Sequence, residues 1–319
     1  MSPIARWTST KARIGAADLG PHCRVQLIAG WCHKRQDGCN LTSARRPESD
    51  LRIDVKANVG AIELTFLGTR GEIKIRSRRH RRHSSLLVHY KNTRIMIDCG
   101  ADWLGQLRAI APTAIALTHA HPDHASGLAE GAPCPVYATK QTLDSLRRYP
   151  IRDQHRLSLR KSVTVGGVRF EAFPVRHSIR APAVGYRVSA GRHSFFYLPD
   201  VAELKNVSAA LGGIDIYIGD GATMRRSMVR KKNGTLIGHA PITRQLEWCE
   251  KARVGCAIFT HCGSPIVRAD SRQVERIVRR LGLERGLDAR IAYDGLTLTI
   301  DPNLCFARAA RGYPQLADR

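Results

Sequence analysis

This sequence of 319 residues lacks two features, a long apolar run and a CxxC motif, and each absence excludes a class of protein or site. No uncharged apolar run approaches the roughly 18 residues that a transmembrane helix needs, which excludes an ordinary membrane-spanning segment. The nine cysteines form no CxxC pair, and their number is odd. Such cysteines are typical of reduced thiols and not of a disulfide framework, so we expect a cytoplasmic protein.

Acidic residues are also scarce. The chain has 27 Asp and Glu against 51 Lys and Arg, a formal net charge of +24. Residues 1–57 carry a net charge of +5, which leaves +19 for the rest of the chain. An arginine excess can reflect a GC-rich genome, but a folded body this basic also attracts polyanions and phosphorylated substrates. The charge therefore favours an anionic substrate without identifying it.

Hydrophobic periodicity divides the chain into an extension, one domain and a tail. Residues 1–57 show no sustained period and predict a flexible or non-core N-terminal extension. From Ala61 onward, short β-branched or aromatic runs end at Gly, Pro, Asp or Asn, which is typical of strands. The predicted strands are Ala61–Leu67, Ser85–His89, Arg94–Asp98, Ala114–Thr118, Val136–Thr139, Val163–Phe173, Val184–Val188, Ser194–Leu198, Ile214–Ile218, Cys256–Thr260, Arg290–Tyr293 and Leu296–Ile300.

Helical patterns interleave with these strands at Lys140–Arg148, Thr243–Ala252 and Ser271–Leu283. Before the last of them, Asp270 and Gln273 are spaced like a capping box. No repeat and no internal linker interrupts the pattern. We therefore predict a single domain over residues 58–300, followed by a C-terminal tail over residues 301–319.

Four potential metal ligands lie within six residues, directly after an apolar predicted strand. His119 and His121 are alternate residues of an extended segment and can point to one side, whereas Asp123 and His124 turn away after the intervening proline. One ion could take the first pair and a second ion the next pair. Imidazole and carboxylate groups suit Zn²⁺ and, less strongly, Mn²⁺ or Fe. The spacing thus predicts a metal site on a loop.

This His-x-His-x-Asp-His run resembles the signature of the metallo-β-lactamase superfamily. In that family a later histidine completes the first site, a carboxylate bridges the two sites, and a last histidine completes the second. The matching residues each follow a predicted strand: His177, Asp200 and His261. The resemblance covers residues 61–300 and implies an α+β fold, the αββα sandwich of two packed mixed β-sheets with helices on the outer faces. It also implies that Asp98 supports the metal-binding loop without ligating an ion.

The resemblance implies a binuclear site of five histidines and two aspartates. Its members are His119, His121, His177, Asp200, Asp123, His124 and His261. A site of this kind suits an anionic ester. The penicillin-hydrolysing branch typically lacks a carboxylate of the Asp200 type and often uses cysteine, so antibiotic hydrolysis is disfavoured. Phosphodiesterases, thioesterases and lactonases share the bridged set, so the ligands leave these three classes open.

Two further features favour phosphodiesters. Residues 74–83 carry six Lys and Arg, and they lie where the superfamily places a loop over the metals. The candidate phosphate ligands of this Arg-rich loop are Arg76, Arg78, Arg79, Arg81 and Arg82. A solvated charge run is the alternative interpretation. Ribonuclease Z and the phosphoribosyl cyclic phosphodiesterase of phosphonate metabolism carry a non-ligand histidine before the last ligand, where it protonates the leaving alkoxide. His239 matches that histidine, and Asp123 would orient the attacking water.

The sequence departs from ribonuclease Z in one respect. No sizeable insertion between residues 125 and 260 corresponds to the protruding arm that grips tRNA, so tRNA 3′ processing is not expected. We predict a hydrolase with two divalent ions, Zn²⁺ or else Mn²⁺ or Fe, acting on a small or cyclic phosphodiester or a nucleic-acid end. The alternatives are a thioester or lactone hydrolase and a catalytically silent nucleic-acid-binding protein. No membrane partner is expected, and a homodimer remains open.

Overall fold

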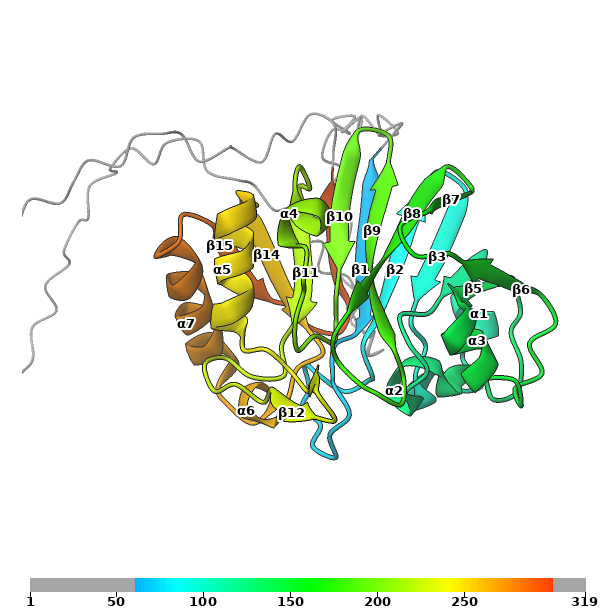
Figure 1. Cartoon of the computed structure of the whole chain (residues 1–319), viewed down its shortest axis with the longest axis horizontal. Helices are drawn as coiled ribbons and strands as arrows, with labels where there is room; N and C mark the ends of the chain where they lie inside the picture. The colour runs from blue at the N-terminus through cyan, green and yellow to red at the C-terminus, as the bar shows by residue number, and fades with distance from the viewer. Residues whose placement is uncertain (1–60, 301–319) are drawn as a thin grey trace, which may run out of the picture.

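The computed structural model describes residues 61–300, which form two packed β-sheets covered by helices (Figure 1). The first sheet has the strand order β16 (Leu296–Ile300), β1 (Ile62–Gly68), β2 (Ser85–Tyr90), β3 (Thr93–Ile97), β4 (Ala114–Ala116), β5 (Val136–Thr139) and β6 (Gln154–Leu157). The second sheet has the order β15 (Asp288–Ile291), β14 (Cys256–Thr260), β11 (Ile216–Asp220), β10 (His193–Tyr197), β9 (Ala183–Ala190), β8 (Val168–Val175) and β7 (Ser162–Val165). The predicted αββα sandwich is confirmed. The predicted extension over residues 1–57 and tail over residues 301–319 lie outside the described residues, so the domain boundaries stay predictions.

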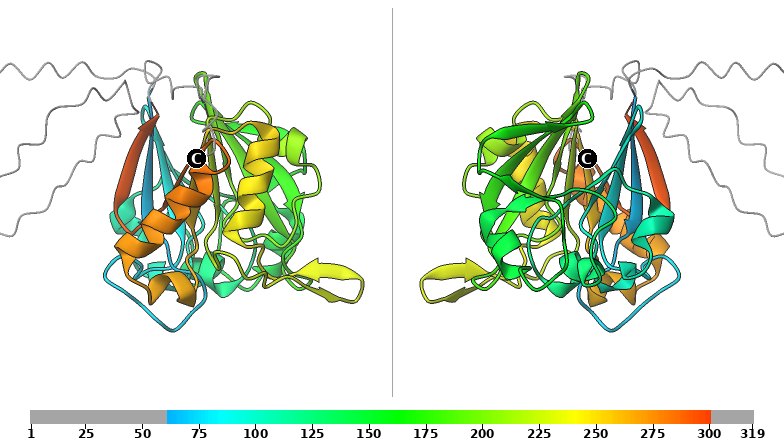
Figure 2. Two further views of the ribbon diagram at one scale, coloured as in Figure 1. Left: turned by 90° about the vertical axis from the view of Figure 1, so that its left-hand side faces the viewer. Right: turned by 90° about the vertical axis from the view of Figure 1, so that its right-hand side faces the viewer.

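Helices cover the outer face of each sheet, as the two side views show (Figure 2). The first sheet carries η1 (Ala101–Trp103), α1 (Leu107–Ile110), α2 (Pro122–Ala125), η2 (Ser126–Leu128) and α3 (Lys140–Ser145). The second carries α4 (Val207–Leu211), α5 (Ile242–Ala252), α6 (Ser264–Val267) and α7 (Ser271–Leu283). None of the helices within residues 61–300 has the length and apolar character that a membrane crossing requires.

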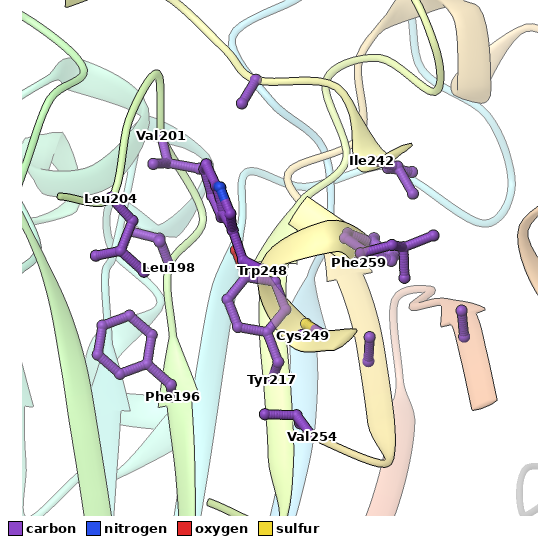
Figure 3. Packing of buried hydrophobic residues seen from close by; sticks show 14 of the residues in the cluster. Phe196, Leu198, Val201, Leu204, Tyr217, Ile242, Trp248, Cys249, Val254 and Phe259 are labelled. Carbon is purple, nitrogen blue, oxygen red and sulfur yellow. The ribbon is translucent and has the colours of Figure 1, made fainter. Parts of the chain in front are cut away.

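Alternate residues of the central strands pack into different layers of the core. On β10, Phe195 and Tyr197 point between the sheets, whereas Phe196 packs under the helices of the second sheet. Figure 3 shows Trp248 of α5 and Tyr217 of β11, which belong to that outer layer. Both faces of the sheet are therefore buried, and its strands read as continuous apolar runs.

The predicted helix over Ser271–Leu283 is confirmed residue for residue, and the Asp270 carboxylate accepts a hydrogen bond from the Gln273 backbone N–H at 2.9 Å. The other two predicted helices differ by a few residues at one end. The predicted single strand over Val163–Phe173 is wrong, because the chain turns at Gly166 and Gly167 to form a hairpin of β7 and β8. Both glycines have positive φ, which a two-residue hairpin turn requires.

Three strands have no counterpart in the prediction. One is the edge strand β6. The other two, β12 (Arg230–Lys232) and β13 (Thr235–Ile237), form a separate hairpin, which projects from the sandwich between β11 and α5 in chain order (Figure 2). The hairpin has only three residues in each strand, so it does not contradict the prediction that no sizeable insertion interrupts residues 125–260.

Candidate metal centre

The predicted ligands all follow strands that end at the same edge of the sandwich. In the first sheet, β3 and β4 are parallel and lead into Asp98 and the loop of His119. In the second sheet, β8, β10 and β14 run in one direction and lead into His177, Asp200 and His261. Parallel strands place their carboxyl ends together, so residues far apart in the sequence meet at one edge.

Asp98 is hydrogen-bonded to two residues of the ligand-bearing segment, Thr118 and His124. The side chain is fully buried, and its Oδ1 accepts the Thr118 backbone N–H at 2.8 Å. Its Oδ2 accepts a hydrogen bond from His124 Nδ1 at 2.9 Å, so the His124 Nε2 lone pair turns inward. Burial raises the pKa of Asp98, while the contacts with His124 and Thr118 oppose that rise. The supporting role predicted for Asp98 matches this geometry and remains a proposal.

The predicted ligands gather into two groups. In the first, His121 Nδ1 lies 3.0 Å from His119 Nε2 and 3.4 Å from His177 Nε2. In the second, Asp123 Oδ2 lies 3.2 Å from His124 Nε2 and 3.1 Å from His261 Nε2. Each group offers ligand atoms that are all within 4.8 Å of one another.

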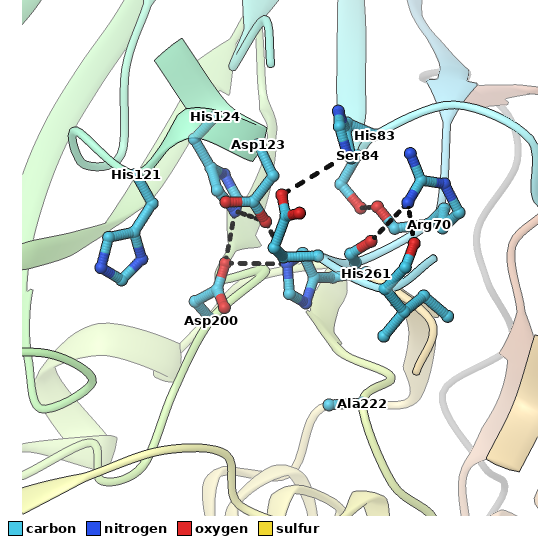
Figure 4. A network of polar contacts seen from close by, with 12 residues as sticks. Arg70, His83, Ser84, His121, Asp123, His124, Asp200, Ala222 and His261 are labelled. Carbon is cyan, nitrogen blue, oxygen red and sulfur yellow. Dashed lines mark hydrogen bonds and ion pairs between the residues drawn. The ribbon is translucent and has the colours of Figure 1, made fainter. Parts of the chain in front are cut away.

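Asp200 lies between the two groups, as a bridging carboxylate must. One of its oxygens, Oδ1, is 3.6 Å from His177 Nε2 in the first group. The other, Oδ2, is 2.7 Å from His124 Nε2 and 3.4 Å from His261 Nε2 in the second (Figure 4). Burial alone would raise the pKa of Asp200, but the surrounding His261, His177 and His124 hold it well below its usual value.

The donor set fits divalent cations. In the first group, His121 Nδ1 lies within hydrogen-bond distance of the Nε2 atoms of His119 and His177. A neutral imidazole has only one N–H, so these three nitrogens cannot all be paired by hydrogen bonds to one another. The buried atoms His124 Nε2 and Asp200 Oδ2 lie 2.7 Å apart, but neither makes a hydrogen bond of acceptable geometry to a described residue. A cation between these lone pairs would satisfy them, and the mixture of imidazole and carboxylate suits Zn²⁺. Burial lowers the pKa of His119 well below its usual value, which keeps this ring in the neutral form that a ligand needs.

His239 lies beside the ligands and has a partner that the sequence reasoning missed. Its Nδ1 is 2.8 Å from Oδ2 of the fully buried Asp220, and its ring stacks on His261 with centroids 5.7 Å apart. Asp220 also accepts the backbone N–H groups of Val201 and Ala222. Burial alone would lower the pKa of His239, but the Asp220 carboxylate raises it to about 9. Asp220 therefore holds His239 in one orientation and favours its protonated form.

A cavity of about 1050 Å³ opens beside these residues. Five ligand candidates and His239 contribute to its lining. Beyond them the lining carries Arg225, Arg226 and Arg230, from the segment that leads into β12. Glu72, on the opposite loop, is the one further carboxylate among the described residues that line it. The cavity is therefore cationic on one side.

The Arg-rich loop does not supply this cationic side. None of its five candidate phosphate ligands is among the described residues that line the cavity: Arg76, Arg78, Arg79, Arg81 and Arg82. Arg76 pairs with Asp102 at 2.8 Å, while Arg79 and Arg82 lie over aromatic rings at 4.2 and 4.7 Å from the ring centres. Three of the five side chains thus have partners within the fold, and the phosphate-binding role predicted for this loop stays a prediction.

Comparison with known proteins identifies the family. A sequence model of the beta-lactamase superfamily domain matches residues 93–262, which include every predicted ligand. The chain therefore belongs to the beta-lactamase superfamily, and the predicted family resemblance is confirmed. It is a protein of the metallo-β-lactamase fold, related to metal-dependent hydrolases, with a His and Asp cluster that could bind metal.

Individual relatives are more distant. The chain is 25% identical to ribonuclease Z of Methanopyrus kandleri over 269 residues, which cover 67% of this chain and 93% of that protein. The crystal structure of Zn²⁺-bound PqqB from Methylobacterium extorquens superimposes with a TM-score of 0.58 at 21% identity, covering 74% of this chain and 99% of the other. A diphosphatase of the PhnP family gives a TM-score of 0.53 at 20% identity, covering 75% and 97%. At these identities the solved structures establish the fold alone.

Proposed function

We propose that this protein is a binuclear metal-dependent phosphodiesterase. The observation that carries the proposal is the Asp220–His239 pair: His239 lines the cavity beside the candidate ligands His177 and His261, and the buried Asp220 lies behind it. A histidine held in this way is built to deliver a proton to a group that leaves from the metal centre.

The candidate ligands divide naturally between two ions. His119, His121 and His177 would hold the first, and Asp123, His124 and His261 would hold the second, with Asp200 shared between them. Divalent ions bound there, Zn²⁺ or else Mn²⁺ or Fe, would polarise the phosphoryl oxygens and activate water. Asp123, whose Oδ2 is 3.1 Å from His261 Nε2, would orient the attacking water.

His239 determines which ester the site suits. Because Nδ1 is bonded to Asp220, the proton available to a substrate is the one on Nε2. General acid help of this kind is typically worth about 10²–10⁴-fold in rate. An alkoxide leaving group needs that proton, whereas a thiolate departs without it, so the arrangement favours an oxygen ester over a thioester. The arginines of the cavity lining, which have no ion-pair partner within residues 61–300, further favour a phosphodiester over an uncharged lactone.

The test compares two leaving groups in the His239→Ala variant. Hydrolysis of an alkyl phosphodiester should fall about 10²–10⁴-fold in kcat/KM, while hydrolysis of bis-p-nitrophenyl phosphate should fall far less, because p-nitrophenolate departs without a proton. Asp220→Asn should shift the two activities in the same direction but less strongly. His155→Ala, which removes an exposed histidine paired with Asp153, is the matched control and should change neither.

Metal content must be measured in every variant so that a lost ion is not mistaken for a lost acid. If the losses of kcat/KM for the two substrates agree within a factor of about three, His239 is not the general acid. Wild-type turnover of a thioester or lactone in place of either diester would favour the alternative hydrolase. An absence of all turnover in metal-loaded protein would favour the silent nucleic-acid-binding protein.

A further inference from the structure

The hairpin of β12 and β13 is a short protrusion built around a two-residue turn. Arg230, Lys231 and Lys232 pair with the three residues of β13, and Asn233 and Gly234 connect the strands. Both turn residues have positive φ, at 47° and 75°, which gives the tight turn that suits a twisted two-stranded ribbon. Figure 2 shows this ribbon extending away from the sandwich at the end that carries the metal centre. Its three basic side chains are all exposed.

The base of the hairpin is attached directly to the candidate site. The Met228 backbone N–H donates to the His239 carbonyl at 3.1 Å, and the Gly238 N–H donates to the His177 carbonyl at 2.9 Å. Gly238 has a φ of +101°, and a Cβ at this position would collide with the Met228 carbonyl. The two edges of the ribbon thus meet at one catalytic candidate and one ligand candidate, so the ribbon continues the cavity wall outward.

This wall carries positive charge that has no ion-pair partner in the part of the chain that the structure describes. Between Asp220 and Glu247 the sequence has no acidic residue. Arg225, Arg226 and Arg230 line the cavity, and Lys231 and Lys232 lie beyond it. Among the residues that the structure describes, none of these five side chains has an ion pair, a hydrogen bond or an aromatic ring as a partner. Cations left unpaired on one continuous surface are available to a polyanion.

The geometry points to a single-stranded nucleic acid as the substrate, with its backbone running from the metal centre along the β12–β13 hairpin. This inference rests on the proposed phosphodiesterase function and names its substrate class. The cavity of about 1050 Å³ lies at the upper limit of sites for a single small molecule. Ile73, Met224 and Met228 give its lining an apolar component that unpaired bases can contact. Phosphates on one side of the scissile bond would then follow the unpaired cations out of the cavity.

The decisive measurement is the salt dependence of binding. A fluorescent single-stranded RNA of about ten nucleotides, and the DNA of the same sequence, are titrated with the metal-loaded protein at several salt concentrations. Each phosphate contact contributes about 0.7 to the slope of log K against log salt for a single strand, so the triple variant Arg230→Gln/Lys231→Gln/Lys232→Gln should lower the slope by about 2. We expect its affinity at low salt to fall at least about tenfold. The oligonucleotide that binds more tightly identifies RNA or DNA as the ligand.

A matched control variant shows whether a loss of binding is specific to the hairpin or follows from the lower net charge alone. Arg147→Gln/Arg148→Gln/Arg152→Gln also removes three exposed charges, but from positions after α3 that are outside the cavity lining. Its salt slope and affinity should stay close to those of the wild type. Equal losses in both triple variants, or no loss in the hairpin variant, would overturn the inference.

Turnover of a small substrate reports the proposed function independently. The double variant Lys231→Gln/Lys232→Gln, whose two residues lie outside the cavity lining, should hydrolyse bis-p-nitrophenyl phosphate with a kcat/KM within about twofold of the wild type, because it keeps every ligand candidate, Asp220, His239 and the arginines of the lining. Its KM for a single-stranded oligonucleotide should rise, with a smaller change in kcat. A wild-type protein that binds the strand through the hairpin but hydrolyses no diester would contradict the phosphodiesterase proposal and leave the binding surface in place.

Discussion

The substitution Asp98→Asn tests whether the residue beneath the ligand loop controls metal binding. Asp98 follows β3 with a φ of +63°, is fully buried, and uses both carboxylate oxygens as acceptors. Oδ1 receives the Thr118 backbone N–H at 2.8 Å, and Oδ2 receives the His124 Nδ1–H at 2.9 Å. Asparagine has the same shape but only one acceptor oxygen, so it cannot serve both donors.

The effect of Asp98→Asn on stability and metal affinity depends on the orientation of the new side-chain amide. If its NH₂ group faces the Thr118 N–H, two donors oppose each other and a buried hydrogen bond is lost, at about 1–3 kcal/mol. If the NH₂ group faces His124, the ring must accept at Nδ1 and carry its proton on Nε2, the atom that points to Asp200. A protonated Nε2 cannot ligate a metal. Changes to such supporting residues typically cost about 10–100-fold in metal affinity, and we expect a loss in that range.

Competition with a chelator of known affinity measures the loss directly, and urea unfolding reports the cost to the fold. Asp215→Asn is the matched control, because Asp215 accepts the Ser194 backbone N–H at 2.8 Å and lies 3.3 Å from His193 Nδ1 but stands near the opposite end of β10. This control should bind metal as tightly as the wild type. If Asp98→Asn kept its metal affinity within about twofold, the reasoning about the His124 tautomer would be refuted.

Three further outcomes are expected. Metal-replete protein should contain close to two ions per chain by elemental analysis, and His121→Ala should lower both occupancy and activity; one ion or none in the wild type would contradict the binuclear proposal. Gly100→Ala should weaken metal binding, because its Cβ would collide with the Asp123 backbone, whereas Gly255→Ala meets open space and should not. Burial and the adjacent arginine lower the pKa of His80 to about 4, so its unfolded form takes up a proton at pH 5 and its folded form does not. Stability should therefore fall as the pH drops from about 6.5 towards 4, and urea unfolding at pH 7 and pH 5 should show a loss about 2 kcal/mol smaller in His80→Gln; an equal loss would contradict the assigned pKa.

The ligand candidates could be predicted because metal chemistry restricts both residue type and position. Four of them stand within six residues, and the others each follow a strand that the apolar runs made visible. Asp220 was missed for a local reason. The predicted strand Ile214–Ile218 stopped two residues short, whereas β11 ends at Asp220 itself, on the same edge as the ligands. A carboxylate at the end of a buried parallel strand was the available signal, and only pairing with His239 gave it meaning.

The β12–β13 hairpin was missed although its turn is written in the sequence. Asn233 and Gly234 form a strong hairpin signal when alternating apolar residues flank them. Here the flanking segment Arg230–Lys232 is entirely basic, so the pattern of a half-buried strand is absent. The ribbon has three backbone-paired residues on each side of its turn, and its apolar contacts are confined to its base, where Ile237 is buried and Val229 packs against the core.

The two basic segments show why a count of charges could not locate the proposed binding surface. The Arg-rich loop has the higher density of arginine in the sequence, but Asp102, 26 residues after Arg76, pairs with that arginine, and the distant Asp294 accepts hydrogen bonds from two backbone N–H groups of the loop. Its remaining interactions with aromatic rings hold the loop against the sandwich. The segment before β13 has fewer arginines, yet the fold brings no carboxylate to them among the described residues. What matters for a polyanion is the charge that folding leaves unpaired, and only the tertiary structure shows where that charge is.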